Sequence, residues 1–335
     1  MGLPYTSIER AVVTDARKAA LVEYGFSDSE ADNIMQVSPR NPLFYRADAI
    51  RSKLANLEAY GFSKEEVREI VVGSTAALGG AEDSVNSKFR NLEAYGFSPE
   101  EVRKIVAGLP PVLGLAEESV RSKLKNYEAY GFSKDEVRRI IVRCTSALSN
   151  SENSINSKLR NLEVYGFTPE EVRKIVAGLP PVLGLGEESV RSKLANLEAY
   201  GFDRGEVRKI VVDSSVLEKS EDSVNSKLGN LEKTRTYHNG FASGFSRDEV
   251  RRFVLSFPAV LNYSKHNAAQ KIRTMTIITE GDKQEMLEMG KNWMQSAMKT
   301  VKRARHLQDE GIKWRHNKNI FASAKRFQKK YGVAL

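Results

Sequence analysis

The sequence predicts an all-α protein: a right- or left-handed α-solenoid of about seven 35-residue helix–turn–helix repeats, followed by a basic C-terminal helical extension. The first observation behind this prediction is the tripeptide Tyr-Gly-Phe, which recurs every 35 or 36 residues from Tyr24, Tyr60, Tyr95, Tyr130, Tyr165 and Tyr200. A seventh, less faithful copy begins at Gly244. Such a period is typical of solenoids, whose repeats must stack to bury their apolar faces. The second observation is that no stretch alternates with the two-residue period of a strand.

Two of the repeats are almost identical. Residues 96–124 read GFSPEEVRKIVAGLPPVLGLAEESVRSKL, and residues 166–194 differ from them at two of 29 positions. These segments belong to the third and fifth repeats and lie 70 residues apart. We infer that a 70-residue pair of repeats was duplicated as one piece.

The repeats divide the chain into three parts: an N-terminal cap at 1–23, the repeat array at 24–279, and a basic C-terminal cap or tail at 280–335. Of the 335 residues, 41% are hydrophobic, which suffices for a long, narrow core and is too much for a disordered chain. No apolar run approaches the roughly 20 residues of a membrane span, so a membrane partner is not expected.

Catalytic and metal-binding chemistry has little support in the residue pattern. The single cysteine, Cys144, lies among apolar positions of a repeat and is expected to be a packed thiol. One cysteine also favours an intracellular reducing compartment, either the cytoplasm and nucleoid or an organelle matrix. The four histidines show no metal spacing and no Gly-rich phosphate loop occurs, so we expect no enzyme, no cofactor and no metal.

Each repeat is expected to begin with a helix that has a strong start signal. In the third repeat Ser98 precedes Pro99, and Glu101 follows at the position that completes a capping box. The apolar positions after it, Val102, Ile105, Val106 and Leu109, form one helical stripe. Pro110 and Pro111 then end this first helix.

A second helix follows the short link PVLGLAEE. Val120, Leu124 and Tyr127 share one face of this helix, and Gly131 stands where a left-handed glycine commonly ends a helix. Each repeat therefore reads as first helix, short turn and second helix.

This pattern resembles a known family. The stretch GFSPEEVRKIVAGLPPVLGLAEESVRSKLKNYEAYGF is similar to a repeat of the mitochondrial transcription termination factor (mTERF) family, and the resemblance extends over about residues 24–279. It implies a curved α-solenoid that binds nucleic acid in its concave groove, usually duplex DNA and sometimes RNA.

One lysine recurs at the same position of the second helix in six repeats, and stacking would bring these side chains into line. We name this set the lysine ladder: Lys53, Lys88, Lys123, Lys158, Lys193 and Lys227. Phosphate contacts supply most non-specific affinity for nucleic acids, so the ladder is predicted to contact phosphates. The alternative is a solvated flank whose lysine stems cover apolar neighbours.

Two residues before each lysine, the residue type alternates. This Arg/Asn column consists of Arg51, Asn86, Arg121, Asn156, Arg191 and Asn225. Arginine suits guanine edges and asparagine adenine edges, but duplication of a repeat pair explains the alternation equally well. Positions two apart lie about 160° apart around a helix, so only one of these two sets can line a groove.

A third recurring position is always asparagine: Asn56, Asn91, Asn126, Asn161, Asn196 and Asn230. We expect this asparagine column to cap a helix or to bond a neighbouring repeat rather than to read bases.

The regular pattern ends in the sixth repeat. The insertion KTRTYHNGFASGF (233–245) is predicted to be a loop or hinge. From Asp282 onward the chain carries 13 basic and 5 acidic residues, which gives +8 of the net charge of +9. Arg303 and Arg305 in this extension are predicted nucleic-acid contacts, unless the extension packs on the array as a cap.

The sequence thus predicts a monomer that binds nucleic acid with sequence or structure dependence, duplex DNA being the expected partner, in transcription or gene regulation. A protein-interaction scaffold and a single-stranded RNA binder are the alternatives, since repeat arrays serve all three.

Deletion of residues 313–335 is expected to lower affinity for every duplex by a similar factor, because uniform positive charge acts on phosphates that look alike. Binding isotherms and thermal melts of the truncated chain test this. A melting temperature lower by several degrees with an unchanged salt dependence would instead make the tail a structural cap.

Overall fold

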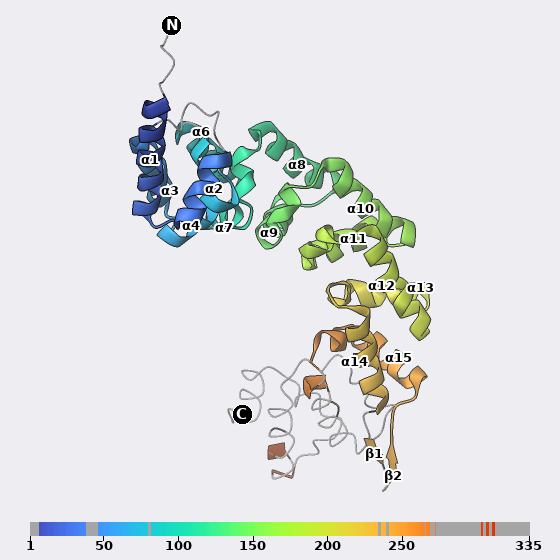
Figure 1. Ribbon diagram of the computed structural model, residues 1–335. Coiled ribbons are helices and arrows are strands. Elements are labelled where there is room, and N and C mark those ends of the chain that lie inside the picture. Colours follow the sequence, from blue (N-terminus) through green and yellow to red (C-terminus); the bar gives the residue numbers. More distant parts are fainter. Residues whose placement is uncertain are drawn as a thin grey trace. The chain divides into compact units, whose positions relative to one another are not determined.

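The computed structural model describes residues 7–37, 46–79, 82–233, 236–238 and 241–264, with residues 266–268, 272, 303, 306–307 and 310–311 in addition. The chain divides into two compact bodies, Met1–Arg160 and Asn161–Leu335, and the division falls within helix α10 (Glu152–Tyr165). Helices make up almost all of the described residues in both bodies, which confirms the predicted all-α repeat fold (Figure 1).

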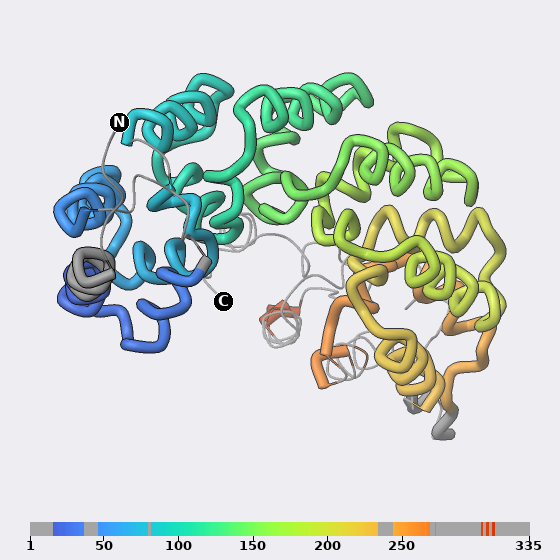
Figure 2. The backbone as a smooth tube through the Cα atoms, turned by 45° about the horizontal axis from the view of Figure 1, so that its top comes forward, coloured from blue at the N-terminus to red at the C-terminus, as the bar shows by residue number. Residues whose placement is uncertain are grey.

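The helices occur in two sets that alternate along the chain. The first helices are α2 (Asp28–Val37), α4 (Lys64–Gly73), α7 (Pro99–Gly108), α9 (Lys134–Arg143), α11 (Pro169–Gly178), α13 (Arg204–Val212) and α15 (Arg247–Ser256). The second helices are α3 (Ala47–Tyr60), α6 (Glu82–Tyr95), α8 (Glu117–Tyr130), α10, α12 (Glu187–Tyr200) and α14 (Glu221–Lys233), with α1 (Ser7–Tyr24) before the first repeat. In each body these helix pairs follow one another in chain order (Figure 2).

Each first helix begins at a capping box, as predicted. The Ser98 hydroxyl accepts from the backbone N–H of Glu101 at 3.2 Å, and the Glu101 carboxylate accepts from the Ser98 backbone N–H at 2.8 Å. Equivalent boxes begin α4, α9, α11, α13 and α15, and Ser27 and Glu30 exchange the same bonds at α2. Two otherwise unpaired backbone donors are thereby satisfied at each start.

The Tyr-Gly-Phe signature ends α1 and the second helices α3, α6, α8, α10 and α12, and it anchors the next first helix. Gly131 has a φ of 108°, a left-handed conformation that a side chain would strain. Its N–H donates to the Glu128 carbonyl at 2.9 Å, and the Phe132 N–H donates to the Tyr127 carbonyl at 3.2 Å. This is a Schellman ending, and it turns the Phe132 ring into the core.

The link between the two helices is more regular than the sequence indicates. In the third repeat it is a 3₁₀ helix, η2 (Pro110–Gly114), in which Val112 and Leu113 are buried. The later repeats have equivalents at η3 (Thr145–Leu148), η4 (Pro180–Gly184), η5 (Val216–Glu218) and η6 (Pro258–Asn262), and the second repeat has a short α-helix, α5 (Ala76–Gly79). These links therefore add a third apolar element to each of the six layers, from the second repeat to the seventh, whose link the structure describes.

Polar side chains join successive repeats at two recurrent positions. An arginine of four first helices, α4, α9, α13 and α15, reaches the capping-box glutamate of the repeat before it; Arg138 Nη2 lies 2.9 Å from Glu101 Oε2. The pairs Arg68–Glu30, Arg208–Glu171 and Arg251–Glu206 repeat this contact at 3.2, 2.6 and 2.9 Å. The tyrosine of the signature donates to a glutamate of the next second helix, in the pairs Tyr24–Glu58, Tyr60–Glu93, Tyr95–Glu128, Tyr165–Glu198 and Tyr200–Glu232.

The predicted loop or hinge after the sixth repeat contains a β-hairpin, so the expectation of no strand was wrong here. Strands β1 (Thr236–His238) and β2 (Phe241–Ser243) pair antiparallel, with Thr236 opposite Ser243. The two residues between them in sequence are Asn239 and Gly240, a dipeptide that strongly favours a two-residue hairpin turn. The pairing is too short to change the fold class.

Acid is expected to loosen the array below about pH 4.5. Backbone N–H and hydroxyl bonds from Ser27, with Arg68, lower the pKa of Glu30. Burial raises the pKa of Glu101, but the Ser98 N–H and Arg138 outweigh it, so that this pKa lies below its usual value of 4.5. Because the folded pKa is the lower one, the stabilisation is complete above about 4.5 and is lost as the pH falls through the folded pKa.

Glu101→Gln tests this interpretation. We expect a melting temperature about 2–4 °C lower at pH 7, since the charge-assisted bond to Arg138 is weakened, and a smaller further loss in acid. Glu100→Gln is the matched control, because Glu100 bonds only Lys104 on its own helix. If the melting temperature falls equally in the two variants, Glu101 does not stabilise the contact between repeats.

Candidate nucleic-acid interface

The structure places the lysine ladder against the turn of the following repeat. Lys53 and Lys123 are only 7% and 9% exposed, and their ammonium groups donate to the carbonyls of Leu78 and Leu148 at 2.5 and 2.6 Å. Three further ladder lysines donate to carbonyls in the same way: Lys88 to Leu115 at 2.7 Å, Lys193 to Lys219, and Lys227 to Leu261 at 2.5 Å. Lys158 is half-buried.

These bonds give the ladder a role within the array. The carbonyls at the end of each link lack a helical partner, and a lysine from the preceding repeat supplies a charged donor. Burial lowers the pKa of Lys53 and of Lys227. Contact between the ladder and phosphate stays a prediction, and such contact would have to use the remaining ammonium protons.

The asparagines of the Arg/Asn column are engaged as well. Asn156 and Asn126 exchange two amide hydrogen bonds, at 3.0 and 3.1 Å. The pairs Asn56–Asn86 and Asn196–Asn225 form the same reciprocal contact, at 3.0 and 3.0 Å and at 3.1 and 2.9 Å. The expectation that the asparagine column bonds to a neighbouring repeat is therefore confirmed for Asn56, Asn126 and Asn196.

The arginines of the same column remain in solvent. Half or more of each of these side chains is exposed: 52% for Arg51, 52% for Arg121 and 66% for Arg191. Arg51 reaches Glu23 of α1 at 2.7 Å, whereas Arg121 and Arg191 contact only glutamates of their own helices. The column thus separates into asparagines that link repeats and arginines that face water.

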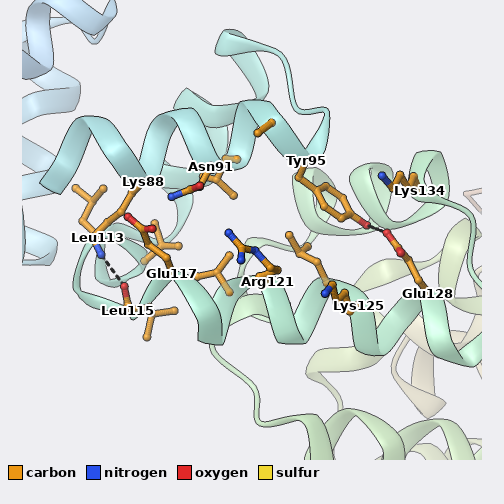
Figure 3. Close-up of a pocket in the computed structure, with 15 residues that line it drawn as sticks. Lys88, Asn91, Tyr95, Leu113, Leu115, Glu117, Arg121, Lys125, Glu128 and Lys134 are labelled. Atoms are coloured by element: carbon orange, nitrogen blue, oxygen red, sulfur yellow. Dashed lines mark hydrogen bonds between the residues drawn. The ribbon is translucent and has the colours of Figure 1, made fainter. Parts of the chain in front are cut away.

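A pocket of about 240 Å³ lies between α6 and α8, where Arg121 faces Asn91 (Figure 3). Its floor is apolar and includes Leu92, Val112 and Leu124. Its rim carries Lys88, Arg121, Lys125 and Lys134 against Glu117 and Glu128, and Glu128 already accepts from Tyr95. The rim is therefore positively charged overall.

Two rows of exposed cations were not predicted from the sequence. The first-helix row consists of Lys104 and Arg139 in the N-terminal body and Lys174, Lys209 and Arg252 in the C-terminal body, one residue after the arginine position that joins repeats at Arg138, Arg208 and Arg251. The second-helix row consists of Arg90, Lys125 and Arg160 in α6, α8 and α10. Both rows follow the 35-residue spacing and could have been found from it. They are less regular than the lysine ladder, because Glu69 replaces a cation in the first-helix row and Ala55, Ala195 and Gly229 replace cations in the second-helix row.

The first-helix row is little used inside the array. Lys104 pairs with Glu100 on its own helix, and Arg139 donates to a carbonyl of its own helix. Lys174 reaches Asp213 at 2.9 Å. Within the described residues, Lys209 and Arg252 have neither an ion pair nor a hydrogen bond from their side chains. The row is therefore available to an anionic ligand.

The mTERF family model matches residues 16–127 and 122–238, together about two thirds of the chain. The chain belongs to the mTERF family. Members of this family bind nucleic acids, and enzymatic activity is not typical of them. A comparison with curated proteins gave no match.

The remaining predicted contacts of this mTERF protein lie in the extension. Arg303 is 1% exposed, and burial lowers the pKa of its guanidinium, unlike the exposed contact that the sequence predicts. Arg305 and the aromatic residues of the tail, Trp314, Phe321, Phe327 and Tyr331, lie outside the described residues.

Other chemistry is limited in the described part of the chain. Cys144 is buried at the end of α9, which confirms the packed thiol. The described histidines, cysteine and carboxylates form no cluster suited to a metal ion. None of the described helices has the length and apolar content needed to cross a membrane.

Lys123→Gln is expected to lower the free energy of unfolding by about 1–2 kcal/mol, because the Leu148 carbonyl loses a charged donor in a buried place. Lys125→Gln, two residues away and exposed, is the matched control and should change stability by less than about 0.5 kcal/mol. Chemical denaturation measures both.

The Lys123→Gln variant also tests the predicted phosphate contact of the ladder. If Lys123 also meets phosphate, its loss should reduce the slope of log affinity against log salt by about one. An unchanged slope in Lys123→Gln would assign the ladder to repeat packing alone.

Proposed function

We propose that this mTERF protein binds duplex DNA through exposed cations of its repeats, with sequence or structure dependence, and acts in transcription or gene regulation. The observation that carries this proposal is the first-helix row. Four arginines of the preceding position, Arg68, Arg138, Arg208 and Arg251, are bound to glutamates of the repeat before them, and five ladder lysines to carbonyls of the next repeat. Within the row of Lys104, Arg139, Lys174, Lys209 and Arg252, Lys174 alone contacts another repeat among the described residues, in an exposed ion pair with Asp213.

The spacing of the row suits a linear polyanion. First helices of successive repeats pack on one another, α7 on α9 and α11 on α13 and then α15. Packed helices lie about 8–10 Å apart, and duplex DNA carries one charge per about 1.7 Å of its axis. Each cation of the row can therefore find a phosphate without a demand on base sequence.

The aromatic residues favour a duplex over a single strand. Single-strand sites combine cations with exposed aromatic rings on which bases stack. In the repeats the phenylalanines of the signature are buried, and the signature tyrosines are half-buried and bonded to glutamates. The large hydrophobic side chains exposed in the described residues are Val22, Val72 and Val164, on three separate helices. This scatter also argues against an apolar docking surface for proteins.

A triple variant tests the row: Arg139→Gln, Lys209→Gln and Arg252→Gln. Fluorescence anisotropy with a labelled duplex of random sequence, from low to physiological salt, should show a salt slope smaller by about three and a weaker affinity for every sequence. Single-stranded DNA and duplex RNA serve as competitors and should compete less well than duplex DNA.

The matched control removes three cations that pack over tyrosine rings: Lys64→Gln, Arg204→Gln and Arg247→Gln. It lowers the net charge by the same amount. A slope reduced equally in both triple variants would mean that total charge, not the row, binds DNA.

A further inference from the structure

The junctions between second helices are of two kinds that alternate along the chain. We call a junction closed when its helices share a reciprocal asparagine pair: α3–α6, α8–α10 and α12–α14. A second bond accompanies each pair, from Ser52 to Glu82, Ser122 to Glu152 and Ser192 to Glu221, at 2.6 Å each. Closed junctions therefore recur every two repeats.

The α6–α8 junction is open. Arg121 stands there in place of the asparagine, opposite Asn91, and the 240 Å³ pocket lies beside them (Figure 3). The Asn91 amide nitrogen is 3.5 Å from the Ser87 hydroxyl, at the limit of a hydrogen bond. Arg121 contacts Glu118 at 3.3 Å on its own helix. Neither side chain links the two helices among the described residues.

The open junction has more hydrogen-bond donors than acceptors. Two asparagines satisfy each other because each amide has a donor and an acceptor, whereas arginine has five N–H donors and no acceptor. Arg121, Asn91 and the exposed Lys125 thus converge with more N–H groups than the junction can use. A ligand with a planar pair of acceptor atoms would satisfy these N–H donors.

We propose that nucleic acid is contacted along the second helices once every 70 residues, at the open junctions, with Arg121 binding the oxygens of one phosphodiester and Asn91 assisting. Asn161 and Arg191 hold the same two positions in the fourth and fifth repeats and are assigned the same role. Asn86, Asn156 and Asn225 close their junctions and make no contact. This inference rests on the proposed function and adds contacts from the second helices to those of the first-helix row.

Phosphate is favoured over a base edge by the surroundings of Arg121. Its neighbours Lys88, Lys125 and Lys134 at the pocket rim are point charges that suit phosphate and discriminate little among bases. A guanidinium binds paired phosphate oxygens in bidentate fashion. Guanine offers a similar acceptor pair, so the experiment separates the two.

The test exchanges the two kinds of junction in the full-length chain. Arg121→Asn should create an asparagine pair with Asn91 and close the junction; Asn156→Arg should open the closed one at α8–α10. Both residues occur naturally at equivalent positions, so both variants are expected to fold, which thermal melts verify. Lys64→Gln removes one positive charge elsewhere and is the control for Arg121→Asn.

Anisotropy with duplexes of several sequences, over a range of salt, is the measurement. Arg121→Asn should weaken binding by about three- to tenfold for every sequence and reduce the salt slope by about 0.9, and Asn156→Arg should increase both. Lys64→Gln should change affinity by less than about twofold. Arg191→Asn repeats the test at the second assigned position.

Three results would overturn the inference or part of it. If Arg121→Asn matches Lys64→Gln while the wild type binds normally, the open junctions make no contact, although the proposed function stands. If Arg121→Asn loses affinity only for some DNA sequences, Arg121 contacts a base edge rather than a phosphate. If Asn156→Arg folds but leaves affinity unchanged, opening a junction does not create a contact. Absence of salt-dependent binding by the wild type would instead contradict the proposed function itself.

Discussion

One carboxylate in each of four repeats, Glu30, Glu101, Glu171 and Glu206, connects local helix formation to the stacking of repeats. Glu101 accepts from the backbone N–H of Ser98 at 2.8 Å and from Arg138 of the next repeat at 2.9 Å, through the same oxygen. A first helix that frays at its start would therefore also lose its partner repeat. Stability in such arrays is a sum of repeat and nearest-neighbour terms, and here a single side chain contributes to both.

This constraint decides which recurring residues are free to act on a ligand. At the most regular positions of the sequence, the ladder lysines, the signature tyrosines and the joining arginines, most side chains bind the neighbouring repeat, as Lys123, Tyr95 and Arg138 do. Cations that some repeats lack, such as those aligned with Lys209 or Lys125, face solvent. In a solenoid a position that every repeat retains is often needed for stacking, so the less regular positions are better candidates for function.

The alternation of junctions gives the array a module of two repeats. A closed junction such as Asn126–Asn156 holds its helices by complementary amides, while the junction at Arg121 leaves donors and a pocket. Duplication of a 70-residue piece copies one junction of each kind, so it lengthens the array without disturbing the pattern. The near identity of residues 96–124 and 166–194 fits such growth.

Features whose partners lie within a few residues could be predicted from the sequence alone. The capping box of Ser98 and Glu101, the left-handed Gly131 and the buried stripe of Val102, Ile105 and Val106 follow from local geometry and from the 3.6-residue period. The hairpin at 236–243 was equally local, and its Asn-Gly signal was overlooked.

Whether a polar side chain of a second helix contacts the next repeat or water depends on tertiary packing and could not be predicted from local sequence. Lys123 binds a carbonyl 25 residues away, and Asn126 an amide 30 residues away. Sequence spacing places such residues on a flank, but the rotation of one packed helix against the next decides whether that flank meets a repeat or water. That rotation is set by the whole apolar interface, so Lys123 turned inward while Lys125, two residues later, remained exposed.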